Sequence, residues 1–138
     1  MNYKINNYRI TKLNSRKGAL PWKIMLFWKS PLAFALRIVK LYRYLTEEKK
    51  EYILSKELLI SGTNIGRHVK EAVYAESREV FVNEFGVARR KSADTEYWLQ
   101  LLMFGGVLSE KEYESVDADR IEVTKLINSI RTTTKNNG

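Results

Sequence analysis

The 138-residue sequence contains no cysteine, one histidine, only two prolines and seven glycines. Without cysteine there is no disulfide framework, no thiolate metal site and no thiol nucleophile. The single histidine, His68, excludes any site that needs two imidazoles from one chain. The scarcity of proline and glycine argues against an all-β sandwich or barrel, because such folds need frequent turn signals. The length fits one domain that can bury a real core.

The sequence also lacks a segment that could span a membrane or direct secretion. Charged residues interrupt every stretch that approaches the roughly 20 apolar residues of a spanning helix. The apolar run 24–28 is short and flanked by Lys23 and Lys29, unlike a signal peptide. There is no glycine-rich phosphate loop, dinucleotide fingerprint or Glu-x-x-His motif in the sequence. We therefore expect a cytoplasmic protein without membrane association, cofactor or metal.

Positive charge is concentrated at the start of the chain. The formal net charge is +8, yet residues 1–29 hold seven Lys or Arg and no acid. Residues 30–138 hold 17 bases and 16 acids, so the body is nearly neutral. Such a basic tail can contact phosphates flexibly, or it can simply keep the protein soluble. We divide the chain into a basic irregular extension (1–29), a helical bundle (30–134) and a frayed C-terminus (135–138).

Apolar residues recur at three- and four-residue steps in the first half of the bundle, which predicts two helices. The first covers 31–45, begins at a proline and is apolar around most of its circumference. A helix of this kind needs a second surface to cover it, which indicates self-association. The second helix follows a cap at Thr46 and runs to about residue 75. Its Gly62 and Gly66 weaken the helix and need a packing reason.

The same periodicity predicts two further helices in the second half. Ser77 caps a helix over 78–105, which Gly105 and Gly106 end. The pair Ser109 and Glu112 forms a capping box that opens the last helix. The connections are short, so consecutive helices should run antiparallel. The predicted fold is therefore an all-α, antiparallel up-down four-helix bundle with a basic irregular N-terminal extension.

The densest basic run of the body lies in the third predicted helix, and two further bases lie in the second. If these helices pack together, their bases can border one groove and contact phosphates. The predicted nucleic-acid-binding residues are Arg67, Lys70, Arg89, Arg90 and Lys91. The alternative is a solvated helix face, paired with acids such as Glu84.

Other chemistry-bearing residues fit structural roles better. Tyr97 and Trp98 could stack on bases, but aromatic residues at helical spacing more often form a core or an oligomer interface. His68 would need a partner carboxylate and a nucleophile to act as a general base. Glu71 and Glu76 lie within or near helical reach, but glutamate is common on any helix, so we expect a surface or interface histidine. The acidic stretch 110–122 lacks a calcium-loop pattern and is expected to be a solvated face. We expect a protein that is not an enzyme.

Four stretches, in this order, are similar to the family of proteins encoded in intervening sequences of bacterial 23S rRNA genes. They are FALRIVKLY (34–42), SGTNIG with VKEA (61–72), DTEYWL (94–99) and LSEKEY (108–113). The resemblance implies an up-down four-helix bundle that assembles as a ring, typically a homopentamer. It also reaches a relative that serves as accessory factor to the reverse transcriptase of diversity-generating retroelements. That relative is a basic ring that binds nucleic acid and its enzyme partner.

The chain departs from the family pattern at several places. Relatives tend to have a small residue and Asn where this chain has Arg67 and His68. Gly86 replaces a polar or small helix former, and the run 89–91 is more basic than usual. We therefore expect a non-enzymatic, oligomeric bundle that binds RNA or DNA weakly and without sequence specificity. The alternative is an interaction scaffold, or an accessory subunit that docks a protein partner such as a reverse transcriptase.

Overall fold

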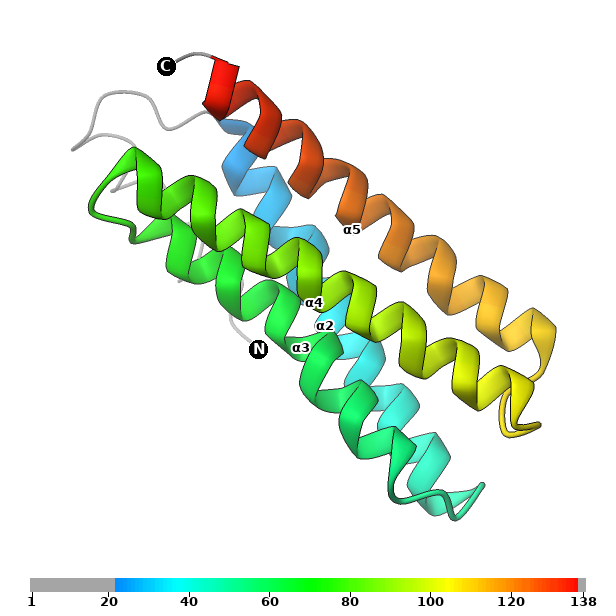
Figure 1. Cartoon of the computed structure of the whole chain (residues 1–138). Helices are drawn as coiled ribbons and strands as arrows, with labels where there is room; N and C mark the ends of the chain where they lie inside the picture. Colours follow the sequence, from blue (N-terminus) through cyan, green and yellow to red (C-terminus); the bar gives the residue numbers. More distant parts are fainter. Residues whose placement is uncertain (1–21, 137–138) are drawn as a thin grey trace.

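The computed structural model describes residues 22–136, with side chains from Ser30 onward, as four long helices (Figure 1). In chain order they are α2 (Trp22–Glu47), α3 (Leu54–Val73), α4 (Arg78–Phe104) and α5 (Glu110–Asn136). Within this described part there is no strand. The predicted all-α four-helix bundle is confirmed. Residues 1–21, which form most of the predicted extension, lie outside the described residues.

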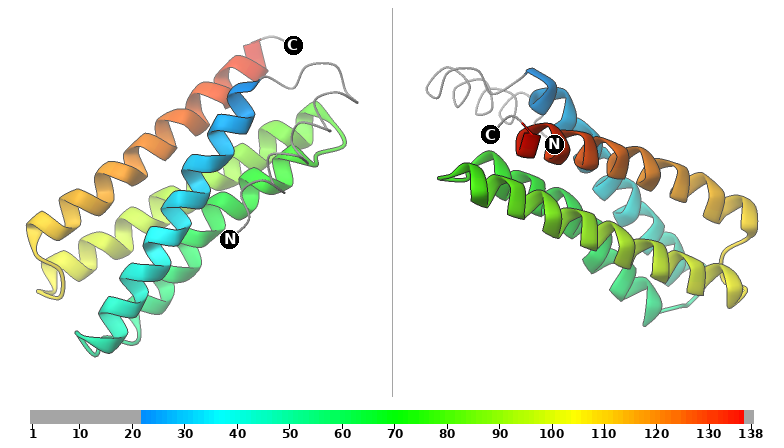
Figure 2. Two further views of the ribbon diagram at one scale, coloured as in Figure 1. Left: turned by 180° about the vertical axis from the view of Figure 1, so that it is seen from behind. Right: turned by 45° about the horizontal axis from the view of Figure 1, so that its top comes forward.

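Consecutive helices pack side by side, and α5 returns beside α2 to close the bundle (Figure 2). Among these neighbouring pairs, the contact between α3 and α4 is the most extensive, and the contact between α2 and α5 is the least extensive. Arg37 of α2 bridges this last seam. Its Nη1 donates to the Ser115 carbonyl at 3.0 Å and to Asp119 Oδ2 at 2.6 Å, and its Nη2 donates to Ser115 Oγ at 2.7 Å.

The first helix begins at Trp22 rather than near residue 31, so residues 22–29 belong to this helix and not to the irregular extension. The sequence-based boundary relied on Pro31, which is tolerated best in a first turn. Here Pro31 lies inside α2 and is buried. A proline inside a helix removes one backbone hydrogen bond, and burial against α3 compensates for that loss. At the other end α5 continues to Asn136, into the predicted frayed segment.

One of the two glycines of α3 has the packing reason that its helical position requires. A Cβ atom on Gly62 would lie 2.8 Å from Ile38 Cγ1, and one on Gly66 would lie 3.4 Å from the Pro31 carbonyl oxygen. Gly62 therefore lets α3 approach α2 closely, whereas an added Cβ at Gly66 would reach only ordinary contact. The core next to this contact contains fully buried side chains from every helix, including Ile38, Leu58, Ile65, Phe85, Leu99, Leu102 and Ile127.

Helix α3 begins at a different cap from the predicted one. Thr46 lies inside α2, where its hydroxyl donates to the Tyr42 carbonyl at 2.9 Å. The carboxylate of Glu51 caps α3 instead, because Oε1 accepts from the N–H of Leu54 at 2.9 Å and Oε2 from that of Ser55 at 2.7 Å. Burial raises the pKa of Glu51, but the backbone N–H groups it accepts from lower it more, so the pKa lies below its ordinary value.

The caps of the last two helices agree with the sequence. Ser77 Oγ accepts from the N–H of Val80 at 3.1 Å at the start of α4. At the start of α5, Ser109 Oγ accepts from the N–H of Glu112 at 3.0 Å, and Glu112 Oε1 accepts from the N–H of Ser109 at 2.8 Å. This capping box holds the pKa of Glu112 below its ordinary value, chiefly through the Ser109 backbone bond. Between the helices, Gly106 has a φ of 79°, which favours glycine.

Candidate nucleic-acid interface

Two polar contacts fix how α3 and α4 lie against each other. Thr95 Oγ1 donates to Ser61 Oγ at 3.1 Å, and His68 Nδ1 lies 2.8 Å from Glu84 Oε2. The stretch of α4 between these contacts is about 16 Å long at 1.5 Å per residue. Four of the five predicted binding residues lie between the two contacts: Arg67, Arg89, Arg90 and Lys91. Lys70 is exposed and lies just beyond His68 on α3.

The three bases of α4 spread around the helix instead of sharing one face. Thr95 contacts α3, and Lys91 lies one turn before it on the same side. Glu96 reaches α5, and Arg89 lies two turns before it on that opposite side. Arg90 lies between them, away from both neighbours. The bases therefore wrap the outer surface of α4, and Arg67 adds to the α3 side.

The α4 arginines have no acidic partner among the residues that the structure describes. Arg89 and Arg90 are exposed, and neither makes an ion pair within that part of the chain. Lys91 is less free, because its Nζ lies 3.9 Å from Asp94 Oδ2. Glu84, which we considered as a partner for this run, is occupied by His68 instead. Two permanent cations thus stay available for an external anion.

His68 forms a local bridge between the two helices. Its Nε2 lies 3.2 Å from Nη2 of Arg67, and Arg67 Nε donates to Asn64 Oδ1 at 2.9 Å. A guanidinium can only donate, so the Arg67 contact assigns Nε2 as the acceptor and leaves Nδ1–H to donate to Glu84. The side chain of His68 is mostly buried. This arrangement positions Arg67 and fits the expected interface role of the histidine.

Charge is divided sharply along the α4–α5 pair. The hydrogen bond of 2.5 Å between Ser92 and Thr124 marks the division. On one side, residues 78–91 and 124–136 carry seven Lys or Arg and two acids. On the other side, residues 92–123 carry two Lys or Arg and eight acids. The basic half includes Arg78, Lys125, Arg131 and Lys135, which the sequence did not single out because they are scattered along it.

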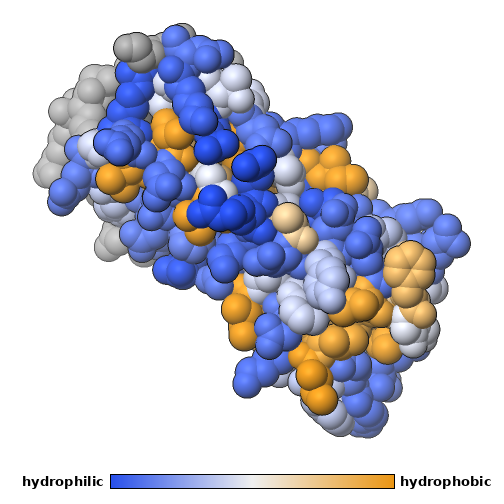
Figure 3. Space-filling view, viewed as in Figure 1, coloured by the Kyte–Doolittle hydropathy of each residue, from blue (hydrophilic) through white to orange (hydrophobic). Residues whose placement is uncertain are grey.

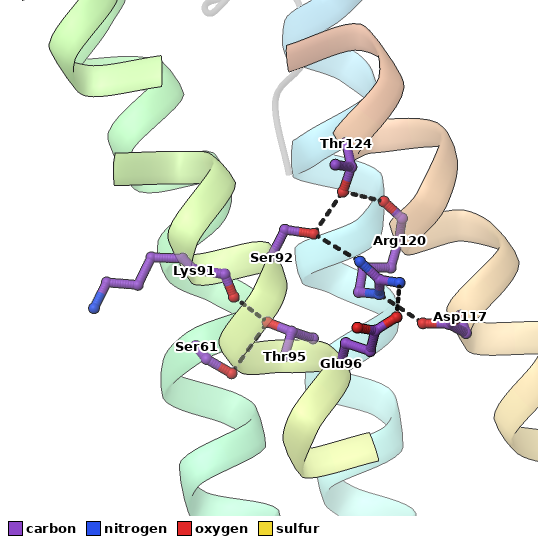
Figure 4. Close-up of polar contacts among 8 residues, drawn as sticks. All are labelled: Ser61, Lys91, Ser92, Thr95, Glu96, Asp117, Arg120 and Thr124. Atoms are coloured by element: carbon purple, nitrogen blue, oxygen red, sulfur yellow. Dashed lines mark hydrogen bonds and ion pairs between the residues drawn. The ribbon is translucent and has the colours of Figure 1, made fainter. Parts of the chain in front are cut away.

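The junction between the halves holds a buried charge network that the sequence analysis missed (Figure 4). Arg120 is 7% exposed; its Nε donates to Asp117 Oδ1 at 2.6 Å and its Nη2 to Glu96 Oε2 at 2.6 Å. Its Nη1 also donates to Ser92 Oγ at 3.2 Å. Asp117 is 8% exposed, so the expectation of a solvated face is wrong for this residue. The spacing Asp-x-x-Arg was the one available signal.

Large apolar side chains are exposed where α3 begins and α4 ends, at the other end of these two helices from the His68–Glu84 contact. Ile53 is 77% and Phe104 80% exposed, and Tyr52 and Tyr97 are also exposed. Tyr97 meets Trp98 edge to face with ring centroids 5.0 Å apart, while Trp98 packs partly against the core. Figure 3 shows apolar side chains gathered where α3 begins and α4 ends, and hydrophilic ones over the middle of the bundle. We call Tyr52, Ile53, Tyr97 and Phe104 the apolar end.

Other site classes find no support in the part of the chain that the structure covers. None of its helices has the length and hydropathy needed to cross a bilayer. Residues 22–136 also contain no group of three or more His, Cys, Asp or Glu side chains that could hold a metal ion. The features that remain are a basic half with unpaired arginines and an apolar end.

The helical bundle that carries these features matches a known protein family. The profile of the 23S rRNA-intervening sequence protein family matches residues 23–129, and the chain belongs to this family. A solved structure from Bacteroides thetaiotaomicron, described as a protein of unknown function from the S23 ribosomal protein family, is 41% identical with a TM-score of 0.78. The match covers 80% of this chain and 98% of that chain. No curated protein matches the chain.

The comparisons confirm the predicted family and correct one boundary. The family match starts at residue 23, within the first turn of α2. Residues 23–29, which lie within the predicted extension, are therefore part of the family domain. Arg131 and Lys135 lie beyond the matched residues.

Proposed function

We propose that this protein is a non-enzymatic, oligomeric, cytoplasmic four-helix bundle that binds RNA or DNA weakly and without sequence specificity. The observation that supports it best is the basic half of the α4–α5 pair, with Arg89 and Arg90 exposed and unpaired within the described residues. Arginine and lysine at a protein surface contact phosphates whatever the base sequence. Arg67 and Lys70 extend this basic surface onto α3. Lys91, on the α3 side of α4, connects the two parts.

Self-association is part of the proposal, because the bundle exposes much apolar surface for its size. Nine large apolar side chains of the described residues are well exposed to solvent. Exposed apolar groups that gather on one region mark interaction surfaces. The homopentameric ring that the family resemblance implies is our proposal for the assembly. Light scattering coupled to size-exclusion chromatography measures its mass, and a monomer at every concentration would contradict it.

The binding test is fluorescence anisotropy with a labelled single-stranded oligonucleotide over a salt series. The variant Arg89→Ala/Arg90→Ala/Lys91→Ala removes up to three phosphate contacts. The logarithm of affinity should then depend less steeply on the logarithm of salt concentration, by about 2 in the slope. The matched control, Lys40→Ala/Arg43→Ala/Lys56→Ala, removes the same charge from exposed positions on α2 and α3. Its slope should stay close to that of the unaltered protein.

Two outcomes decide whether the body or the tail binds. Equal losses in both triple variants would show that net charge alone drives binding, and would contradict the assigned surface. Loss only on removal of residues 1–21, which carry five bases and no acid, would place the activity in the tail. No binding at low salt by the full chain would refute nucleic-acid binding altogether.

The apolar end favours a second candidate function, an interaction scaffold or an accessory subunit of a nucleic-acid enzyme such as a reverse transcriptase. Phe104 is 80% exposed directly before the glycine turn, where a partner can reach it. Phe104→Ser together with Ile53→Ser should abolish capture of such an enzyme and leave oligonucleotide binding unchanged. The triple substitution on α4 should have the reverse effect if nucleic-acid binding is the primary function.

A further inference from the structure

Two arginines of α5 reach across to α4, and only one of them is neutralised. Arg120 is enclosed by the carboxylates of Asp117 and Glu96. Arg131, three turns further along α5, makes no ion pair with any residue that the structure describes. Its Nε is buried and has no hydrogen-bond partner among the described residues. Arg131 as a whole is only partly buried, so its guanidinium can still reach an anion from outside the chain, and a permanent cation without a partner favours one.

The guanidinium of Arg131 lies over Gly86. A Cβ atom on this glycine would lie 3.3 Å from Arg131 Nη2 and 3.4 Å from Nε. Because Gly86 has no side chain, α4 leaves room for the guanidinium in the interface with α5. A glycine inside a helix lowers stability by about 1 kcal/mol relative to alanine. Its presence here therefore indicates that the guanidinium needs the room that a side chain would take. We call this position the Arg131 seat.

A second free cation lies beside the Arg131 seat. Arg89 follows Gly86 by three residues and precedes Ser92 by three, and both of these residues contact α5. Arg89 therefore lies on the edge of α4 that faces α5, one turn from the seat. Arg78, further back on α4, donates to the Thr134 carbonyl at 2.6 Å through Nη2 and holds the end of α5 in place.

The surroundings of the seat contain few competing carboxylates. Helix α5 has no acid from Thr124 to Asn136. The acids in the first half of α4 are Glu79 and Glu84, and Glu84 is occupied by His68 on the side of α3. The geometry points to a phosphate-binding site between α4 and α5, in which Arg131 and Arg89 hold one phosphate group. A guanidinium matches the oxygens of a phosphate with two parallel hydrogen bonds.

This inference rests on the proposed function and deepens it, because it names where a backbone phosphate of the nucleic acid is held. It differs from the surface tested above, since Arg131 was not among the predicted residues. The same chemistry would bind a free phosphate or pyrophosphate. Two ligands therefore have to be compared: a labelled oligothymidylate, measured by anisotropy, and pyrophosphate, measured by titration calorimetry.

Three single variants of the full chain test the site. Arg131→Gln removes the cation and should weaken binding of both ligands about tenfold, the loss expected for one charged hydrogen-bonding partner. Gly86→Leu fills the Arg131 seat and should weaken both to a similar extent. Lys111→Gln is the charge-matched control, because Lys111 is exposed on the same helix and lies outside the basic half. It should change affinity by less than about twofold. Circular dichroism verifies that each variant is folded.

The outcomes separate this inference from the proposed function. Equal effects of Arg131→Gln and Lys111→Gln on both ligands would overturn the site, while oligonucleotide binding by the unaltered chain would still support the proposed function. Pyrophosphate binding that depends on Arg131, without any oligonucleotide binding, would refute the proposed function and keep the site. If the unaltered chain binds neither ligand, both are refuted. If Gly86→Leu does not fold, Arg131→Gln alone decides.

Discussion

The two glycines of α3 should respond in opposite ways to the same substitution. Alanine in place of glycine inside a helix favours folding by about 1 kcal/mol. At Gly66 the added Cβ would meet Pro31 at 3.4 to 3.6 Å, which is ordinary contact, so most of this gain should remain. At Gly62 the added Cβ would lie 2.8 and 2.9 Å from the two γ-carbons of Ile38. Such overpacking costs about 1–3 kcal/mol, which offsets or exceeds the gain.

Gly66→Ala should therefore be more stable than Gly62→Ala by about 1–3 kcal/mol. Urea unfolding followed by circular dichroism, at one protein concentration because assembly affects apparent stability, measures both. The double variant Gly62→Ala/Ile38→Leu provides the control, since leucine has one γ-carbon where isoleucine has the two that the new Cβ meets. It should recover part of the loss. Equal stabilisation by both alanines would refute the close approach of α2 and α3 at Gly62.

Three further outcomes follow from the contacts of single residues. Arg120→Met leaves the buried carboxylate of Asp117 without its cation and should lower the free energy of unfolding by about 3 kcal/mol or more. Arg37→Met, on a more exposed pair, should lower it by about 1 kcal/mol or less. Similar losses for both variants in a urea titration would contradict the burial of the network. Glu51→Gln should destabilise α3 by about 1 kcal/mol through loss of its cap. Because the folded-state pKa of Glu51 is lowered, this contribution should be fully present above the unfolded pKa of about 4.3 and vanish as pH falls through the folded pKa, so a loss unchanged by pH would argue against the cap. Ser109→Ala should cost about 1 kcal/mol by breaking the capping box, and thermal unfolding would show no change if the box were dispensable.

The sequence predicted the fold well because the periodic apolar pattern and the caps act locally. Ser77, Ser109 and Glu112 bond to backbone groups within three residues, so their spacing alone identifies them. The exceptions had tertiary causes. Pro31 resembles a helix start until α3 is seen packing against it at Gly66. Glu51 is not a usual cap, because glutamate is longer than the common cap residues. Its side chain reaches the N–H groups of Leu54 and Ser55, whereas a shorter residue would have to stand closer to the helix.

The candidate site was less predictable, because it depends on which segments meet. The run Arg89-Arg90-Lys91 stands out in the sequence, and the structure adds that its members face different neighbours. Arg131 is separated from Gly86 by 45 positions in the chain, and no local pattern connects a glycine on one helix with an arginine on another. The Asp117–Arg120 pair had a local signal, yet its burial depends on Glu96 and Ser92 across the interface.

The narrow seam between α2 and α5 determines how this bundle opens. Partial unfolding begins where the fewest buried contacts resist it, and this seam, bridged by Arg37, is the least extensive between neighbouring helices of the described residues. Amide protons of α2 and α5 should therefore exchange with solvent before those of the α3–α4 hairpin. A chain in that open state exposes the core face of α2, including Phe34 and Ile38. Two such chains can trade their first helices, so the seam gives this bundle a direct route to domain swapping.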